Sequence, residues 1–210
     1  TPVARRGVML QRSGSAAQHV DCDLAQPAQS AAILDAQFAL LATRRWTELR
    51  LINNAGTLDP IGPLQGSDPD LWSAHLQINI GACVTATGLF LRHFADQSAT
   101  RLIVNISSGA ATTPYYGWSL YCASKAAIEA FTRCVALEQA QTRFPTSIVA
   151  IRPGVIETDM QALIRGAVRA GREVSTAAWR ALAAIARRGS AKDLRHPRGR
   201  AGIRENLRCS

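Results

Sequence analysis

The sequence predicts an α/β fold: a single domain built around a doubly wound parallel sheet. Three short apolar runs rich in branched residues lie at 49–52, 101–107 and 147–151, and each is too short for a helix. Longer segments with helical spacing of apolar residues lie between them, at about 27–45, 69–95 and 118–142. The chain has 210 residues, 47% of them hydrophobic, which suits one domain with a full core. Strands that alternate with helices are typical of such a sheet.

The remaining elements follow from shorter signals. The chain opens with TPVA, which we interpret as the end of a strand, and QHVDCD at 18–23 predicts a further short strand. The run at 49–52 leads into the turn INNAG, Ile52 to Gly56. Small and amide residues in such a turn allow close approach of the backbone and supply internal hydrogen bonds.

Positive charge is concentrated at the C-terminal end of the chain. The net charge of +9 comes entirely from residues 161–210, because residues 1–160 hold 12 basic and 12 acidic residues. This basic segment contains no recognisable nucleic-acid-binding module, so we expect no nucleic-acid partner. Residues 187–210 lack periodicity and predict a basic, poorly ordered tail after a domain that spans 1–186.

Other classes of protein are disfavoured by composition. No apolar run approaches the roughly 18 to 20 residues that a membrane span needs, and the N-terminus has no signal-sequence pattern. We therefore expect a cytoplasmic protein without a membrane partner. The five cysteines form no CxxC pair and no zinc-like spacing with histidine, so no metal site is expected.

The stretch YCASK places Tyr121 and Lys125 four residues apart on the predicted third helix. Side chains at this spacing share one face, with Cβ atoms about 5 to 6 Å apart. Moving the pKa of a phenol from about 10 to about 7 requires about 4 kcal/mol. An ammonium about 5 Å away, at an effective dielectric near 20, supplies about 3 kcal/mol. The pair predicts a tyrosine that acts as an acid; the alternative is two residues that merely share an exposed face.

Further polar residues follow the predicted strands or interrupt an apolar helix. Ser108 follows the central strand in VNISSG, where it can donate to a substrate oxygen or simply serve the turn. Asn79 in QINIGA lies within an apolar helical stretch and needs buried partners. Pro153 and Gly154 end the last strand, and Thr158 can cap a helix or bind phosphate.

The order and spacing of these residues resemble the short-chain dehydrogenase/reductase family, over about residues 1 to 165. That family shares an NNAG turn, a helix asparagine, a strand-end serine, a YxxxK sequence and a PG turn. The counterparts here are Asn53 to Gly56, Asn79, Ser108, Tyr121 with Lys125, and Pro153 with Gly154. The resemblance implies a Rossmann-like fold and an NAD(P)-dependent oxidoreductase.

The resemblance also implies roles for individual residues. In a carbonyl reduction Tyr121 would protonate the substrate oxygen, Ser108 would orient the carbonyl, Lys125 would lower the tyrosine pKa and bind the nicotinamide ribose, and Asn79 would support a water-linked proton path. Contacts with the cofactor are implied for Asn53, Ala55, Gly56, Tyr121, Lys125, Pro153, Gly154, Ile156 and Thr158. Contacts with the substrate are implied for Ser108, Tyr121 and Gly154.

Within the family, LRLINNAGTL, VNISS, GWSLYCASKAA and PGVIETDMQAL resemble sepiapterin reductase and its bacterial relatives that reduce benzil, although that subgroup often has glycine where Ser124 stands. Arg5 would then lie near the adenosine 2′-phosphate, which favours NADPH over NADH, unless it is only a surface arginine. Asp23 and Leu24 would lie against the adenine. The implied reaction reduces a small-molecule ketone, vicinal diketone or pterin side chain to an alcohol, in a homodimer or homotetramer.

Two parts of the family pattern do not occur in the 210 residues. The family begins with a strand, a TGxxxGxG loop and a helix whose N-terminus holds the pyrophosphate. Gly7 and Gly14 do not form that loop, because no apolar strand precedes them. The final strand has no counterpart either. We therefore expect an N-terminally truncated domain with an opened sheet, and the alternative function is a truncated or degenerate homologue that does not bind the cofactor tightly.

Overall fold

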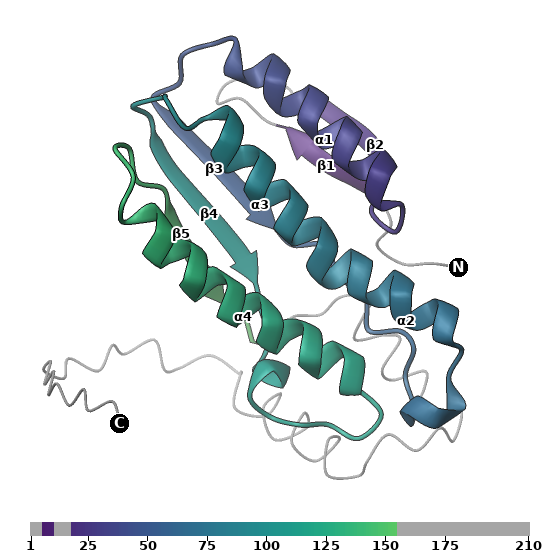
Figure 1. Ribbon diagram of the computed structural model, residues 1–210. Coiled ribbons are helices and arrows are strands. Elements are labelled where there is room, and N and C mark those ends of the chain that lie inside the picture. Colours follow the sequence, from purple (N-terminus) through teal and green to yellow (C-terminus); the bar gives the residue numbers. More distant parts are fainter. Residues whose placement is uncertain (1–5, 11–17, 155–210) are drawn as a thin grey trace, which may run out of the picture.

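A computed structural model of the protein describes residues 6–10 and 18–154 (Figure 1). The predicted alternation of strands and helices is confirmed over these residues. The elements in chain order are β1 (Arg6–Leu10), β2 (Gln18–Asp23), α1 (Pro27–Ala42), β3 (Glu48–Asn53), the 3₁₀ turn η1 (Leu64–Gly66), α2 (Pro69–Leu76), the π-helical turn η2 (Gln77–Gly81), α3 (Ala82–His93), β4 (Thr100–Ile106), the 3₁₀ turn η3 (Gly109–Ala111), α4 (Ser119–Gln139) and β5 (Ser147–Ile151).

The three apolar runs form one parallel sheet in the order β3-β4-β5. β4 is the central strand, and its registers place Ile52 beside Val104 and Val104 beside Val149. Parallel strands have their carboxyl ends at the same edge of the sheet, so the turns after β3, β4 and β5 meet there.

β1 and β2 form a second, two-stranded sheet, and here the structure adds an element that the sequence did not predict. The pairing is antiparallel, from Arg6 opposite Asp23 to Leu10 opposite Gln18, with an irregularity between Arg6 and Val8. β1 is a five-residue strand that begins with arginine and glycine, and it lacks the branched apolar run used to identify the others. The strand end expected at residues 1–4 lies outside the described residues.

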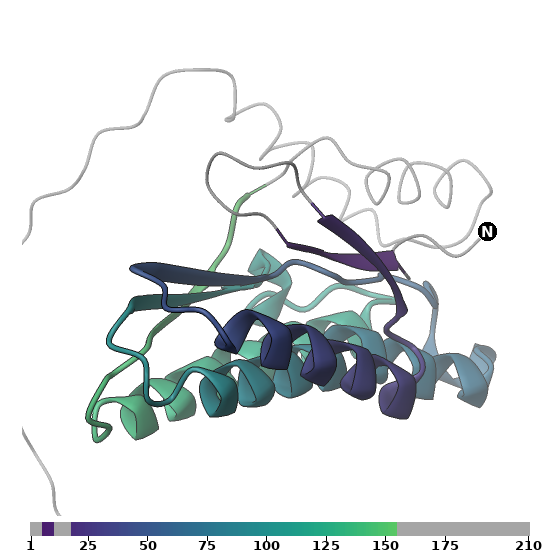
Figure 2. The ribbon, with the colours of Figure 1, turned by 90° about the horizontal axis from the view of Figure 1, so that it is seen from above.

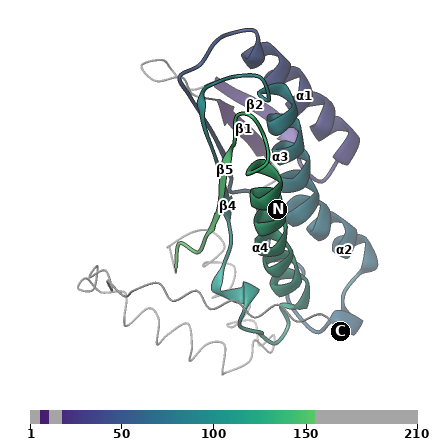
Figure 3. The same cartoon turned by 60° about the vertical axis from the view of Figure 1, so that its left-hand side comes forward.

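The helices that follow the strands lie on one face of the sheet. Figure 2 shows α1, α3 and α4 side by side beneath the parallel sheet, and in Figure 3 the same helices lie to the right of β4 and β5. Their ends follow from local chemistry: Pro27 opens α1 and Pro69 opens α2, where a missing N–H has no cost, and the Asp68 side chain caps α2 by accepting from the N–H of Asp70.

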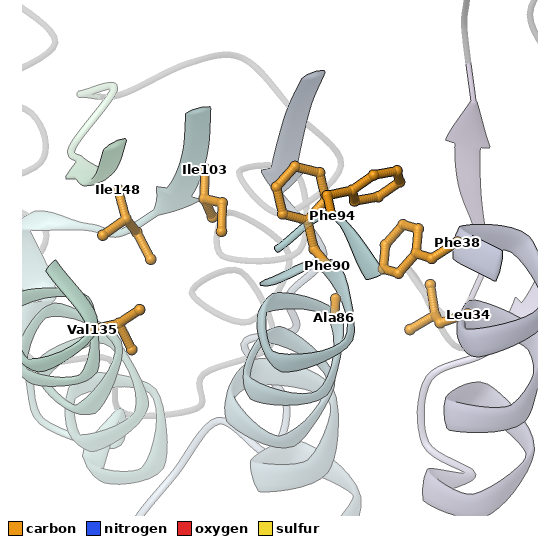
Figure 4. Packing of buried hydrophobic residues seen from close by; sticks show 8 residues of the cluster. All are labelled: Leu34, Phe38, Ala86, Phe90, Phe94, Ile103, Val135 and Ile148. Atoms are coloured by element: carbon orange, nitrogen blue, oxygen red, sulfur yellow. The ribbon is translucent and has the colours of Figure 1, made fainter. Parts of the chain in front are cut away.

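The main core lies between these helices and the sheet (Figure 4). Phe38 of α1, Phe90 of α3 and Phe94 just after α3 pack with ring centres 5.0 to 6.1 Å apart. The cluster joins both outer helices to the strands, and its buried members are Leu34, Phe38, Ala86, Phe90, Phe94, Ile103, Val135 and Ile148.

The other face of the sheet is apolar as well. Ile52, Val149 and Ile151 are 61%, 42% and 43% exposed, and in the register given above Val104 lies between the first two. Within residues 18–154, Figure 2 shows the helices α1, α3 and α4 on the opposite face of the sheet from these side chains. The alternating strand faces therefore carry apolar residues on both sides, as expected for a parallel sheet with two covered faces.

The helical run Pro69–His93 is long and apolar enough to cross a membrane by length and composition alone, but 44% of its apolar 18-residue stretch is buried within the fold. Its middle is the π-helical turn η2, in which the N–H of Ala82 donates to the carbonyl of Gln77, five residues earlier. Such turns add one residue to an otherwise α-helical course and are frequent at functional sites.

Candidate active site

Tyr121 and Lys125 lie on one face near the start of α4, against the end of β4. The two residues are only 7% and 5% exposed. Lys125 Nζ lies 5.6 Å from the centre of the Tyr121 ring and donates a hydrogen bond of 2.8 Å to the carbonyl of Ile106, the last residue of β4. The alternative of an exposed helix face is therefore wrong for this pair.

Ser108 is brought to the same place by the turn after β4. Its backbone is extended, and its hydroxyl caps η3 by accepting from the N–H of Ala110 at 3.2 Å. The same side chain forms a hydrogen bond to Tyr121 that favours the phenolate. Ser108 thus serves the turn and also faces the phenol.

The electrostatics of the pair correct one expectation from the sequence. Burial raises the pKa of Tyr121 above its ordinary value, and the hydrogen bond from Ser108 opposes this only in part. Burial likewise lowers the pKa of Lys125. The sequence-based estimate counted the ammonium, and a bound cationic cofactor for the rest of the shift, but not the loss of water around the phenol. Without cofactor the pKa of Tyr121 therefore shifts in the other direction, and its fall in the cofactor-bound protein stays a prediction. The phenol keeps its proton at neutral pH.

Asn79 lies in η2 and is buried, with 3% of its surface exposed. Its side-chain oxygen accepts from the N–H of Thr57 at 2.7 Å, and its amide nitrogen donates to the carbonyl of Thr57 at 2.8 Å. The amide nitrogen also contacts His75 Nε2 at 2.9 Å and Ser124 Oγ at 3.2 Å. The expectation that this asparagine needs buried partners is confirmed.

Two of those partners, His75 and Ser124, were missed by the sequence argument. His75 precedes Asn79 by four residues, so a polar pair at helical spacing was the available signal. Ser124 is fully buried and donates to the carbonyl of Tyr121 at 2.9 Å while it accepts from Asn79. A glycine at this position would leave the Asn79 amide one acceptor fewer.

The turn after β3 approaches both groups closely. A Cβ atom on Gly56 would lie 3.4 Å from Asn79 Oδ1 and 3.6 Å from Lys125 Nζ, so a side chain here would contact both groups. Ala55, which precedes it, is exposed. Asn53 donates to Asn105 Oδ1 at 2.8 Å and to Thr87 Oγ1 at 3.2 Å. Its amide nitrogen is thus committed to the internal hydrogen bonds that the sequence predicted.

The predicted adenine contacts lie on the other sheet, at the end of β2. Asp23 is partly buried, and its carboxylate accepts from the N–H of Ala25 at 3.0 Å. Leu24 is 6% exposed and packs with Cys22, Ile78 and Ala82. The side chain of Leu24 is therefore a core residue, and β2 is not joined by hydrogen bonds to the sheet that carries Tyr121.

A charged cluster ties the ends of two strands to α4. Glu129 accepts two hydrogen bonds of 2.7 Å from Arg152, just after β5, and one of 2.7 Å from Ser107, just after β4. The bonds from Arg152 and then from Ser107 hold the pKa of Glu129 at about 2, against the opposing effect of burial. Pro153 and Gly154 follow, both exposed, and Gly154 has a positive φ of 82° that favours glycine.

Aromatic side chains also border Tyr121. The rings of Trp118 and Tyr121 meet edge to face at 5.9 Å, and Tyr115 packs on Trp118 at 4.9 Å. The turn before α4 depends on Gly117, whose φ is 76° and whose Cβ would lie 3.1 Å from the backbone of Gly62. This contact brings the segment after β3 against the start of α4.

Three predicted cofactor contacts, Arg5, Ile156 and Thr158, lie outside the described residues. Within 6–10 and 18–154 there is no group of three or more potential metal ligands, and the four cysteines there are free thiols. The described site therefore consists of Ser108, Tyr121, Lys125 and Asn79, brought together at the carboxyl edge of the parallel sheet. Such a set can hydrogen-bond a substrate oxygen and supply it with a proton.

The sequence is similar to known reductases over part of its length. It is 40% identical over 119 residues to benzil reductase ((S)-benzoin forming) of Bacillus cereus, which covers 57% of this chain and 48% of that protein. It is 37% identical over 120 residues to sepiapterin reductase of Meriones unguiculatus, which covers 56% and 44%. The chain thus spans about half the length of these curated relatives.

Solved structures and a family model agree with this similarity. A short-chain dehydrogenase/reductase from Burkholderia vietnamiensis matches with a TM-score of 0.60 and 35% identity, covering 70% of this chain and 67% of that one. A metagenomic short-chain oxidoreductase in complex with NADP matches with a TM-score of 0.58 and 27% identity, covering 69% and 61%. The family model "short chain dehydrogenase" matches residues 4–168. With most of its length matched and its YxxxK pair and strand-end serine brought together, the chain belongs to the short-chain dehydrogenase family.

Proposed function

We propose that the protein catalyses the NADPH-dependent reduction of a carbonyl compound to an alcohol, with Tyr121 as the proton donor. The observation that carries the proposal is the convergence of Ser108, Tyr121 and Lys125 at the end of β4. A phenol that is buried, protonated and adjacent to a second hydroxyl is suited to give a proton to an oxygen that becomes negative during the reaction.

Each residue has a distinct part in the proposed step. Ser108 donates a hydrogen bond to the carbonyl oxygen and orients it. Tyr121 transfers its proton to that oxygen, and Lys125 then stabilises the phenolate, because its ammonium lies 5.6 Å from the centre of the ring. Asn79 supports a path of water-linked protons that restores the phenol. The hydride would come from a nicotinamide cofactor held beside Lys125.

The described residues fit a nicotinamide cofactor. Lys125 uses one described hydrogen bond, to Ile106, and an ammonium has three N–H groups, so two can reach ribose hydroxyls. The bare backbone of Gly56 leaves space beside the ammonium that a Cβ would fill. Further cofactor contacts are proposed for Ala55, Pro153, Gly154 and the backbone of Asn53. The contacts proposed for Ile156 and Thr158 lie outside the described residues.

NADPH is proposed rather than NADH. The support is the proposed contact of Arg5 with the 2′-phosphate and the NADP complex of the metagenomic relative. Asp23 is proposed to lie near the adenine through its exposed surface, whereas the burial of Leu24 restricts that residue to a backbone contact.

The proposed substrate is a small ketone or vicinal diketone, or a pterin side chain. The names of the relatives, benzil reductase and sepiapterin reductase, support this class. The aromatic residues Trp118 and Tyr115 next to Tyr121 support it too, because flat ring systems pack favourably against aromatic side chains. Gly154 is proposed to contact the substrate from the turn after β5.

The test compares Tyr121→Phe with Tyr116→Phe. Tyr116 is 47% exposed and serves as the matched control. Reduction of benzil is followed as loss of NADPH absorbance, in the 210-residue chain and in the chain extended by the residues encoded immediately upstream. We expect Tyr121→Phe to lower kcat by at least about 100-fold, since the proposed acid is removed, and Tyr116→Phe to remain active. Retention of activity by Tyr121→Phe would refute the assignment.

A second candidate is a non-catalytic homologue that binds NADPH weakly. It is the alternative that the sequence analysis left open. Titration of the chain with NADPH by fluorescence separates the two candidates. Binding should also stabilise the fold, by about 2.7 kcal/mol at a ligand concentration 100 times Kd. Tight binding by the 210-residue chain favours the reductase.

We also propose that the protein is a cytoplasmic homodimer or homotetramer that binds neither nucleic acid nor membrane, with the basic residues 187–210 as a tail after a domain of residues 1–186. Exposed apolar side chains on the outer helices support self-association: Leu71 and Leu76 of α2, Val84 of α3 and Leu137 of α4. Light scattering after gel filtration measures the molar mass and hence the oligomeric state.

A further inference from the structure

His75 is almost fully buried in α2, with 1% of its surface exposed, although it has no place in the proposed reaction. Both ring nitrogens have partners. Nδ1 lies 2.7 Å from the carbonyl oxygen of Asp59, and Nε2 lies 2.9 Å from the amide nitrogen of Asn79. The imidazole therefore bridges the segment after β3 and the π-helical turn η2.

The partners determine which nitrogen carries the proton. A carbonyl oxygen can only accept, so Nδ1 must carry hydrogen and donate to Asp59. The amide nitrogen of Asn79 can only donate, so Nε2 is unprotonated when it accepts one of the two amide hydrogens, and the Thr57 carbonyl and the more distant Ser124 hydroxyl then share the other. Both contacts are satisfied together only by the neutral ring with hydrogen on Nδ1.

This ring state bears on the orientation of Asn79. When Nε2 accepts from the amide nitrogen, the amide oxygen is turned to the N–H of Thr57, at 2.7 Å. The same oxygen is the atom that a Cβ on Gly56 would meet at 3.4 Å, on the side where Lys125 Nζ would lie 3.6 Å from that Cβ. The imidazole also anchors Asp59, two residues after Thr57, and so supports the segment that contacts the amide.

We propose that His75, in its neutral form with hydrogen on Nδ1, is a positioning residue that holds the Asn79 side chain with its oxygen towards the N–H of Thr57, and that protonation of His75 releases it. Its effect on catalysis rests on the proposed function, in which Asn79 supports the proton path. Its effect on Asn79 rests on the geometry alone.

The direction of the acid effect follows from the surroundings of the ring. Burial lowers the pKa of His75 below its ordinary value of 6.5, and the backbone carbonyls of Asp59 and Leu120 oppose that effect. The charged groups that act on the ring are Lys125 of α4, which lowers the pKa, and the Asp59 carboxylate, which raises it. The neutral ring is therefore kept above pH 6.5 and lost only at lower pH, where an added hydrogen on Nε2 would face the Asn79 amide donor.

The first test needs neither cofactor nor substrate. The full chain is labelled with ¹⁵N, and ring and side-chain amide signals are followed from about pH 8 to about pH 5. His75→Gln assigns the His75 signal by its disappearance. We expect hydrogen on Nδ1 at neutral pH, a midpoint below 6.5, and a shift of the Asn79 side-chain amide with the same midpoint that is absent in His75→Gln. The exposed His19 on β2 is the control, and His19→Gln should leave the Asn79 shift unchanged.

The second test measures kcat and KM for benzil across the same pH range. His75→Phe keeps a ring and removes both hydrogen bonds, and we expect kcat to fall about 10- to 100-fold with KM within about twofold. His75→Gln can donate and accept without titrating, so it should restore kcat and flatten the acid limb of the profile. Unchanged kcat in a folded His75→Phe overturns the catalytic effect.

The outcomes separate this inference from the proposed function. Two results would overturn the inference even when Tyr121→Phe is inactive. One is hydrogen on Nε2 of neutral His75, and the other is an Asn79 amide signal that does not shift as His75 titrates. The expected ring state and coupled shift, together with an active Tyr121→Phe, uphold the positioning of Asn79 and refute the proposed function.

Discussion

At Gly56 the absence of a side chain leaves room beside two polar groups of the candidate site. A Cβ there would make ordinary van der Waals contact with Asn79 Oδ1 and Lys125 Nζ, and the backbone does not have a positive φ. Alanine should therefore fold, but its methyl group would replace water around the ammonium.

We expect Gly56→Ala to change the free energy of unfolding by less than about 1 kcal/mol and to lower kcat/KM for carbonyl reduction by about 10-fold or more. Chemical denaturation and steady-state kinetics measure the two effects. The control is Gly88→Ala in α3, where the new Cβ meets open space. It should stabilise the helix by about 0.5 to 1 kcal/mol and leave kinetics unchanged. Equal kinetics for both variants would contradict the role of this space.

The sequence predicted which residues form the candidate site better than it predicted their pKa values. Tyr121, Lys125 and Ser108 could be identified because residues four apart on a helix share one face, and because a residue at the end of a strand lies at the edge of the sheet. The direction of the shift in the Tyr121 pKa could not be predicted, because it depends on how far burial removes water from the phenol. His75 was missed because one histidine on a helix is usually unremarkable until its two partners are known.

Among the elements, the turns after β4 and β5 are joined to α4 by one carboxylate. Glu129 binds Ser107, next to the proposed catalytic serine, and Arg152, next to the Pro153-Gly154 turn. Its pKa of about 2 lies below the ordinary 4.5. The folded state thus holds the proton less tightly than the unfolded state, so the resulting stability is present above pH 4.5 and is lost as pH falls towards 2.

We expect Glu129→Gln to melt at a lower temperature than the unmodified protein at neutral pH, because the ion pair with Arg152 is lost. The difference should shrink between pH 4.5 and about 2, where the carboxylate takes up its proton. Thermal unfolding followed by circular dichroism across this range measures it. Glu138→Gln, on an exposed residue of the same helix, is the control. A difference that persists at the lowest pH would show that the charge is not responsible.

The elements themselves were largely predictable, and the exceptions have physical reasons. Strands β3, β4 and β5 are continuous apolar runs, and helices α1, α3 and α4 carry regular apolar spacing. β1 was not predicted because its pairing with β2 is a long-range property that five residues with a glycine do not signal. The π-helical turn could not be predicted either, because the apolar spacing of residues 69–95 resembles that of an uninterrupted helix.

For the whole molecule, the aromatic cluster between helices and sheet is the main source of stability. Phe94 is 1% exposed and contacts the rings of both Phe38 and Phe90. We expect Phe94→Ala to lower the free energy of unfolding by about 3 to 5 kcal/mol, since it removes buried apolar surface and leaves a cavity. The control is Leu137→Ala, at a side chain 73% exposed, with an expected change within about 0.5 kcal/mol. Similar denaturation midpoints for the two would contradict this view of the core.

The π-helical turn at Gln77–Gly81 sets the rotational phase between two parts of the molecule. α3 on one side is fixed to the core, and α2 on the other carries His75 towards the candidate site. Each residue of an α-helix turns the chain by about 100°, so deleting one residue here would restore an ordinary helix and turn α2 by about that angle. A surface loop can absorb a change in length by one residue. At this turn the same change would leave the core packed but move His75 away from the candidate site.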